Sequence, residues 1–210
     1  MKSIAFVIAT ISTLFGILPS LIAFLKIKSA DEIQRLLRIL VWGATLCGLS
    51  AMGLAKLLHI NNLFILHFYT IFDLVMLTLI FRNYIGRNLS RGIIILFVTL
   101  AATNSIFVDK FNSFNVLARS IEAFIIICYA LTFFTLTLKR MDIVKLNRSP
   151  MFWISCGALL YYAASFFIFI FSQDIQPMLD IWYIYWGIHA IFTIVLYIFY
   201  SIALWVQPEK

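Results

Sequence analysis

Asp73 is the residue of this sequence most able to carry chemistry, because it lies near the middle of a long, mainly apolar run, Leu63–Phe81. A helix rises about 1.5 Å per residue, so a helix of this length would place the Asp73 carboxyl near the centre of a lipid bilayer. A carboxylate at that depth costs roughly 2.5–3.5 kcal/mol or more unless it is protonated, paired or hydrated. We therefore expect a functional role for Asp73 and a partner close to it.

The partner of Asp73 must come from another helix, because nothing near it on its own predicted helix neutralises a carboxylate. We predict that Asp73 pairs with Arg119, with His189, or with a hydroxyl of Tyr161 or Tyr162. An Asp73 side chain that faced lipid without a partner would contradict this prediction.

Other polar side chains fall at a similar height in five of the predicted helices. Within the spans they lie at mid-depth and in the outer half, whereas the inner half is almost entirely apolar. This distribution predicts a polar pocket that opens on one side of the membrane. The residues expected to bind a ligand there are Asp73, Tyr69, Thr70, Asn104, Arg119, Glu122, Tyr161, Tyr162, Ser165, Trp186 and His189. Two simpler interpretations stay open: Arg119 and Glu122 as a structural ion pair, and His189 as a core histidine bonded to a neighbouring hydroxyl.

The composition predicts the elements that position these residues. The chain of 210 residues is 63% hydrophobic and 12% charged, whereas about 25% of the residues of a soluble domain are charged. Long apolar runs recur along the whole sequence, which predicts an all-α, polytopic membrane protein that forms a single domain over residues 1–210. We expect seven transmembrane helices, over residues 3–25, 29–59, 63–84, 91–108, 114–138, 151–172 and 179–206.

Local signals refine these helices. Pro19 predicts a kink in the first one. The spacing from Ser29 to Glu32 is typical of a capping box that begins the second. The segment from Gly86 to Ser90 is predicted to be the turn before the fourth helix, and Ser149 with Pro150 predicts the start of the sixth.

The basic residues predict the orientation in the membrane. Twelve of the sixteen Lys and Arg residues lie on one side (26, 28, 35, 38, 82, 87, 91, 139, 140, 145, 148 and 210), against four on the other (2, 56, 110 and 119). The positive-inside rule then places the N-terminus outside and the C-terminus in the cytoplasm. We expect the inner (plasma) membrane of a bacterial cell, with the lipid bilayer as partner. The net charge of +7 reflects this orientation, so no nucleic acid is expected.

Two short sequence matches favour an internal repeat. Residues 71–75 resemble residues 191–195, and Gly43-Ala44 resembles Gly157-Ala158. Both matches pair the first three helices with the last three and leave the fourth as a linker, a 3+1+3 arrangement.

A chain of this length, topology and orientation resembles the broad group of microbial rhodopsins and PQ-loop sugar facilitators. The resemblance covers topology and the repeat, and no diagnostic motif. Residues 179–206 contain no Lys that could hold retinal as a Schiff base, and Pro19 is followed by Ser20 where the facilitators have Gln.

Enzymatic function is not expected. Seven-span hydrolases of the ceramidase type hold zinc with three histidines, an Asp and a Ser. Here His59 falls in a predicted turn, and His189 has no second histidine four residues away. We predict neither a metal nor a cofactor.

Two functions remain. A receptor would bind a small molecule in the outward-facing pocket and signal through a separate partner on the basic cytoplasmic face. A facilitator or proton-coupled transporter would use Asp73 at the midplane, but it should also line the inner half with polar groups, and few are present there. The sequence favours the receptor, with the transporter as the alternative and a membrane hydrolase last.

Overall fold

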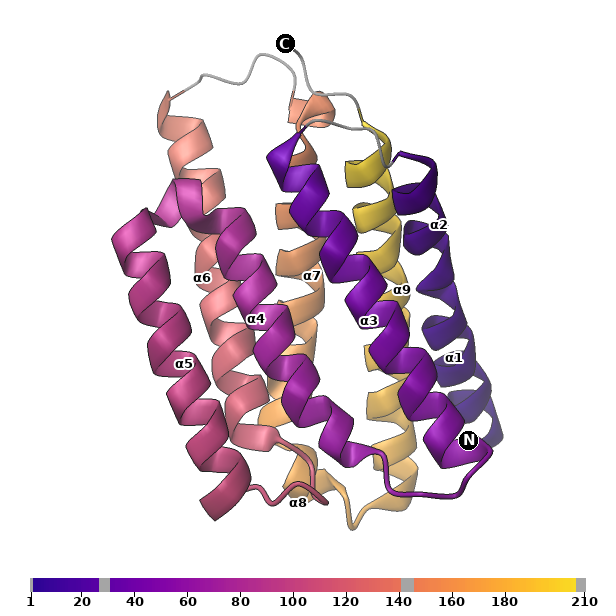
Figure 1. Cartoon of the computed structure of the whole chain (residues 1–210). Helices are drawn as coiled ribbons and strands as arrows, with labels where there is room; N and C mark the ends of the chain where they lie inside the picture. Colours follow the sequence, from indigo (N-terminus) through magenta and orange to yellow (C-terminus); the bar gives the residue numbers. More distant parts are fainter. Residues whose placement is uncertain (1, 27–30, 141–145, 207–210) are drawn as a thin grey trace.

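The computed structural model describes residues 2–26, 31–140 and 146–206, and within these ranges the chain forms helices joined by short turns, without strands (Figure 1). The elements are α1 (Lys2–Phe15), α2 (Ile17–Leu25), α3 (Glu32–Lys56), α4 (Leu63–Ile85), α5 (Arg87–Phe107), α6 (Val116–Arg140), the short 3-10 helix η1 (Leu146–Arg148), α7 (Pro150–Ile170), α8 (Ser172–Ile175) and α9 (Leu179–Trp205).

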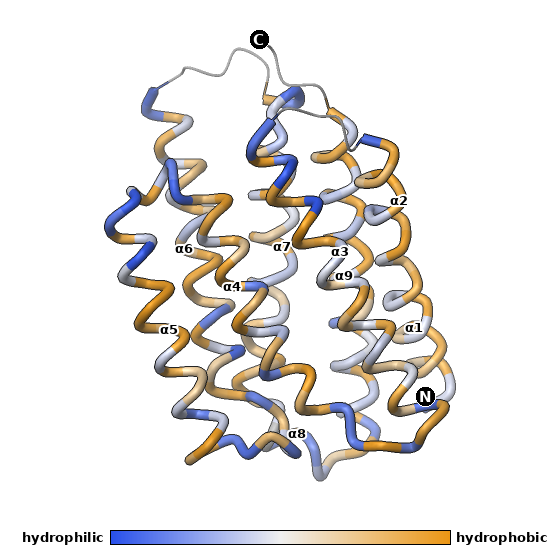
Figure 2. The backbone as a smooth tube through the Cα atoms, in the orientation of Figure 1, coloured by the Kyte–Doolittle hydropathy of each residue, from blue (hydrophilic) through white to orange (hydrophobic). Residues whose placement is uncertain are grey.

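Seven helical segments in this described part are long and apolar enough to cross a membrane, with α1 and α2 together forming the first. The predicted number of helices and the all-α class are therefore confirmed. Apolar residues cover the middle of the helices, and hydrophilic residues gather mainly toward the two ends of the bundle (Figure 2). This pattern is compatible with a multi-pass membrane protein.

The first span is broken at Gly16, between α1 and α2, rather than bent at Pro19 itself. Proline lacks an N–H and its ring clashes with the carbonyl four residues earlier, which here is that of Phe15. α1 ends at this residue. The carbonyl of Gly16 instead accepts a hydrogen bond of 2.8 Å from the Thr45 hydroxyl on α3, so the break is tied to the neighbouring helix.

Two predicted helix starts need correction. α3 begins at Glu32 with Asp31 as its N-cap, whose carboxylate accepts from the Gln34 N–H at 3.1 Å; Ser29, the start of the predicted capping box, lies outside the described residues. α5 begins at Arg87 rather than Arg91. Gly86 adopts φ +92°, a conformation that glycine enters without strain, so the chain reverses in one residue.

Six of the spans form a closed ring, and α5 lies outside it. Around the ring, α1 and α2 pack against α3, α3 against α4, α4 against α6, α6 against α7, α7 against α9, and α9 against α1 and α2. α5 packs against α4 and, less extensively, against α6, and lies at the edge of the bundle in Figure 1. We call the end at which α1 begins the N-terminal end of the bundle and the end at which α9 finishes the C-terminal end.

The C-terminal half of the ring is filled by a large apolar core. Its fully buried side chains come mainly from α3, α4, α6, α7 and α9, and include Leu37, Leu40, Leu77, Ile80, Phe81, Ile126, Phe133, Ile154 and Leu204. The amide of Gln34 donates to the carbonyls of Ala203 at 2.9 Å and Val206 at 2.7 Å. Gln34 therefore caps the last turn of α9, whose carbonyls lack partners within the helix.

Candidate functional site

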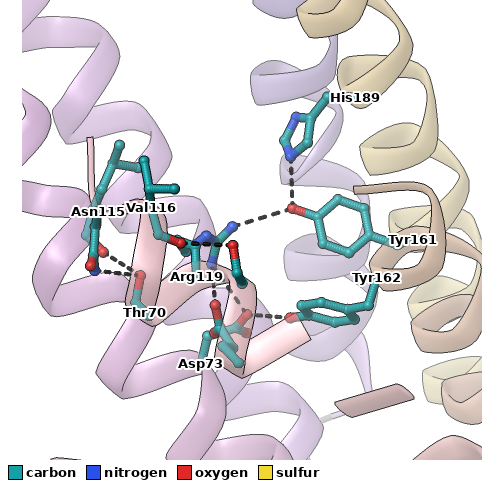
Figure 3. Close-up of polar contacts among 11 residues, drawn as sticks. Thr70, Asp73, Asn115, Val116, Arg119, Tyr161, Tyr162 and His189 are labelled. Carbon is teal, nitrogen blue, oxygen red and sulfur yellow. Dashed lines mark hydrogen bonds and ion pairs between the residues drawn. The ribbon is translucent and has the colours of Figure 1, made fainter. Parts of the chain in front are cut away.

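Asp73 lies inside the bundle, with a side chain that is only 4% exposed. Its carboxylate accepts a short hydrogen bond from the Tyr162 hydroxyl on α7, and the Arg119 guanidinium on α6 lies 3.9 Å away. Figure 3 shows these side chains converging from three helices. The prediction that Asp73 has a buried partner among Arg119, His189 and the two tyrosines is therefore confirmed.

Arg119 is the centre of this cluster. Its Nη1 donates to Glu122 Oε2 at 2.8 Å, one turn along α6. The guanidinium also lies over the rings of Phe169, at 4.8 Å, and Tyr69, at 5.4 Å. Stacking on aromatic faces suits the planar, weakly hydrated guanidinium, so Arg119 is held in one position by charges and rings together.

A chain of polar contacts continues from Arg119 to α9. Nη2 of Arg119 lies 3.4 Å from the Tyr161 hydroxyl, which lies 3.0 Å from Nε2 of His189 (Figure 3). A tyrosine hydroxyl can accept from a guanidinium and donate to an imidazole at the same time. The His189 ring also packs against Trp186 and Phe169, at centroid distances of 5.2 and 5.5 Å.

The cluster contains one guanidinium and two carboxyl groups, all nearly excluded from solvent. Glu122 is fully buried, and its Oε1 has no hydrogen-bond partner among the described residues. Burying charged groups is expensive, and removing one partner of a buried pair leaves the other uncompensated. The two carboxyl groups therefore share a single cation, Arg119, inside the bundle.

A cavity of about 270 Å³ borders this cluster in the N-terminal half of the bundle. Its polar wall carries Arg119, Tyr161 and His189. Its other lining residues come mainly from α1, α3, α4 and α9: Ala9, Ser12, Thr13, Ala44, Cys47, Gly48, Ala51, Ile65, Leu66, Tyr69, Trp186, Ala190, Thr193 and Tyr197. A second cavity, of about 70 Å³, also touches Arg119, Trp186 and His189.

Eight of the predicted site residues thus lie together at or beside this cavity: Asp73, Tyr69, Arg119, Glu122, Tyr161, Tyr162, Trp186 and His189. Ser165 is fully buried but has no partner among the described residues. Thr70 and Asn104 belong to a different network.

That second network joins α4, α5 and the segment before α6. Asn104 donates to Asp109 at 3.1 Å and to Asn115 at 3.0 Å, and Asn115 donates to Thr70 at 3.3 Å. Asp109 in turn accepts from the Leu117 N–H at 3.0 Å in the first turn of α6. These contacts lie near the N-terminal end of the bundle, and none of the four side chains lines the 270 Å³ cavity.

The sequence analysis missed part of the cavity wall. Thr193 and Tyr197 follow His189 at steps of four residues, which places all three on one face of α9, and all three line the cavity. That spacing was visible in the sequence. The role of Cys47 was not, because a small residue in an apolar helix gives no sign of whether it lines a cavity.

The described residues contain no group of three His, Cys, Asp or Glu side chains close enough to share a metal ion. No protein-family model, no curated protein and no solved structure matches this chain.

Proposed function

We propose that this protein is a multi-pass membrane receptor that binds a small molecule in the 270 Å³ cavity and signals through a separate partner. The observation that carries the proposal is the position of that cavity. It borders a buried, charged cluster in one half of the bundle, while the other half is closed by the large apolar core. A binding site without a continuing path suits a sensor better than a carrier.

The proposal includes the orientation in the membrane. With twelve Lys and Arg residues on one side against four on the other, the N-terminal end of the bundle faces outward and the basic end faces the cytoplasm. The cavity then opens toward the exterior of the plasma membrane, and the basic end is the face that a signalling partner would contact.

The proposal also includes the 3+1+3 repeat. A twofold axis along the bundle would exchange α1 with α6, α3 with α7, and α4 with α9. Under this exchange, each pair of neighbouring helices in the ring maps onto another pair of neighbours. The linker of the proposed repeat would be α5, which lies outside the ring. The cavity is lined from both triplets, where a site shared by two repeats is expected.

The size and lining of the cavity limit the ligand. Ligand pockets usually measure about 300–1,000 Å³, so a cavity of about 270 Å³ suits a small metabolite. One wall offers the Tyr161 hydroxyl and the His189 imidazole. The other walls combine small and aromatic side chains with the hydroxyls of Ser12, Thr13 and Thr193. A compact molecule with a hydrogen-bonding head and a partly apolar body fits this lining.

Cys47 allows a direct test, because it lines the cavity and is a free, partly exposed thiol. In the Cys128→Ala/Cys156→Ala variant, we expect Cys47 to react with a small, membrane-impermeant methanethiosulfonate reagent that is added on the side of the N-terminus. The matched control keeps only Cys128, which is exposed on α6 and should face lipid, so it should not react. A Cys47 that is inert from that side, or reactive only from the other, would contradict the proposal.

A proton-coupled transporter is the second candidate, favoured by the two buried carboxyl groups around Arg119. Intramembrane acidic groups are typical of proton pathways. A compound that protects Cys47 from the thiol reagent should be tested for uptake into proteoliposomes. Protection without uptake supports the receptor, whereas uptake that is lost in Asp73→Asn supports the transporter.

A further inference from the structure

The turn between α4 and α5 carries a cluster of arginines that the proposed receptor function does not use. Arg82 comes from the last turn of α4, and Arg87 and Arg91 come from the first two turns of α5. Together with Leu79, Ser90 and Ile94 they line a cavity of about 200 Å³. Positive-inside topology accounts for basic residues at this end of the bundle, but it requires no shared cavity.

The charges in this cavity are only partly balanced. Glu32 on α3 approaches Arg82 at 2.6 Å and is 45% exposed. Arg87 and Arg91 make no ion pair within the described parts of the chain. Because they are four residues apart on one helix, they lie on the same face and repel each other. An anion between them would remove this repulsion.

The start of α5 adds donors of the right kind. Gly86 occupies the N-cap and offers no side chain, so no side chain caps the first N–H groups of α5. Exposed N–H groups and the positive end of the helix dipole both favour a phosphate group. All three basic residues are arginine, whose planar fork binds phosphate oxygens in pairs, which the single ammonium of lysine cannot do.

The cavity also has an apolar side, which distinguishes a lipid from a free anion. Leu79 and Ile94 lie about one helical turn deeper than Arg82 and Arg91, respectively. The surface of α5 continues this wall with Ile95 and Leu96, which are 67% and 69% exposed. A phospholipid has the same order along its length, with a phosphate head followed by acyl chains.

We propose that the groove between α4 and α5 binds the phosphate headgroup of one anionic phospholipid, with its acyl chain along α5. Basic pockets between helices near the cytoplasmic surface are the usual sites for such lipids. The lipid would link α5 to α4. This matters because α5 lies outside the ring and packs mainly on α4.

The test measures phospholipid retained by the purified full-length protein, using native mass spectrometry after titration with phosphatidylglycerol or phosphatidylcholine. We expect phosphatidylglycerol to bind preferentially, and its affinity to fall at least about ten-fold in Arg87→Gln/Arg91→Gln, since each arginine loses its phosphate contacts. The matched control is Lys139→Gln/Arg140→Gln, which removes the same charge from the last turn of α6 and should change affinity by less than about two-fold.

Arg87→Lys/Arg91→Lys keeps the charge and serves if the glutamine variant fails to fold. It should still lose about three-fold or more in affinity, because it lacks the guanidinium fork. Equal losses in the control variant, or equal binding of both lipids, would contradict the proposal. Complete displacement of the lipid by inorganic phosphate at millimolar concentration would also contradict it, since the site would then be one for a small anion.

Discussion

At the scale of single residues, the position of Arg119 explains why so many polar side chains can be buried together. Its guanidinium contacts two carboxyl groups and a hydroxyl, and it lies over two aromatic rings. Each of these groups would be costly to bury alone. The cluster is therefore stable only as a set, and its members should not behave additively when they are replaced.

Arg119→Met should destabilise the protein by about 3–5 kcal/mol, because it leaves Asp73 and Glu122 buried without a cation. The triple variant Arg119→Met/Asp73→Asn/Glu122→Gln should recover a large part of that loss, since it removes the uncompensated charges together. The free energy of unfolding in mixed detergent micelles measures both. If the single variant lost less than about 1 kcal/mol, the carboxyl groups would not depend on Arg119.

Tyr162→Phe should cost about 1–3 kcal/mol, because Asp73 would lose its hydroxyl donor inside the bundle. Tyr200→Phe is a matched control from the same core: Tyr200 is 3% exposed, and its hydroxyl has no partner among the described residues. It should be neutral or slightly stabilising in the same unfolding measurement. Equal effects of the two substitutions would show that the bond to Asp73 contributes nothing.

The pairing of Asp73 could be predicted from the sequence because a carboxyl in an apolar span must have a partner and few candidates exist. The separation of Thr70 and Asn104 from the site could not be predicted in this way. Residues at the same height in a bundle can face different neighbours, and depth alone does not give the rotation of each helix about its axis. The rotation of α4 directs Asp73 toward Arg119 and Tyr162, and Thr70 toward Asn115.

At the scale of elements, two glycines allow close helix packing, one on α3 and one on α7. A Cβ on Gly157 of α7 would lie 2.7 Å from Phe199 Cβ on α9, and a Cβ on Gly43 of α3 would overlap the far edge of the Phe72 ring on α4. The Phe72 ring can rotate away, whereas the Phe199 Cβ is fixed to the backbone. Small residues at such crossings are typical of helices that pack in membranes.

Gly157→Ala should therefore destabilise the protein by about 1–3 kcal/mol, as overpacking does in other tight cores, and Gly43→Ala by less. Gly92→Ala, on α5, is the control, because a Cβ there would meet no atom within 4 Å. It should stabilise the helix by about 0.5–1 kcal/mol. Thermal unfolding of the three variants would test this order. A neutral Gly157→Ala would mean that α7 and α9 can separate without cost.

The residue at which each helix begins or ends could not be predicted reliably from the sequence, as the start of α5 shows. Apolar runs gave the number of spans, but the three polar residues Arg87, Asn88 and Ser90 suggested a longer turn than the chain forms. Arg87 to Ser90 can join α5 because Gly86 alone reverses the chain and the Ser90 hydroxyl donates to the Arg87 carbonyl at 2.9 Å. Polarity at a helix end does not distinguish a turn from a first helical turn exposed to water.

At the scale of the whole molecule, the two ends of the bundle differ in both charge and packing. The C-terminal half holds the large apolar core, and the N-terminal half holds the cavity beside Arg119. Pairing of α4 with α6 and of α9 with α1 closes the ring between segments that are far apart in the sequence. Apolar periodicity gives no information about such pairings, so the sequence did not predict them.

The orientation can be tested on the whole chain. A green fluorescent protein fused after Lys210 should fluoresce and an alkaline phosphatase fused there should be inactive, because each reporter works on only one side of the bacterial inner membrane. Moving four arginines or lysines to the N-terminal loops should weaken this result, as the positive-inside rule requires. An active phosphatase on the unmodified chain would reverse the orientation and would turn the cavity toward the cytoplasm.

The contacts of Gln34 have a consequence for how motion could cross the molecule. α9 is about 40 Å long, and its last carbonyls are held by the Gln34 amide on α3. A tilt of about 5° around that fixed point would move the opposite end by roughly 3.5 Å while the held end stayed in place. α9 would then tilt about its C-terminal end, and another helix would have to carry a displacement at that end. We expect this helix to be α6, because it carries both Arg119 and the exposed Lys139 and Arg140. Spin labels at positions 138 and 205 should report movement of α6, and not of α9, when the cavity is filled.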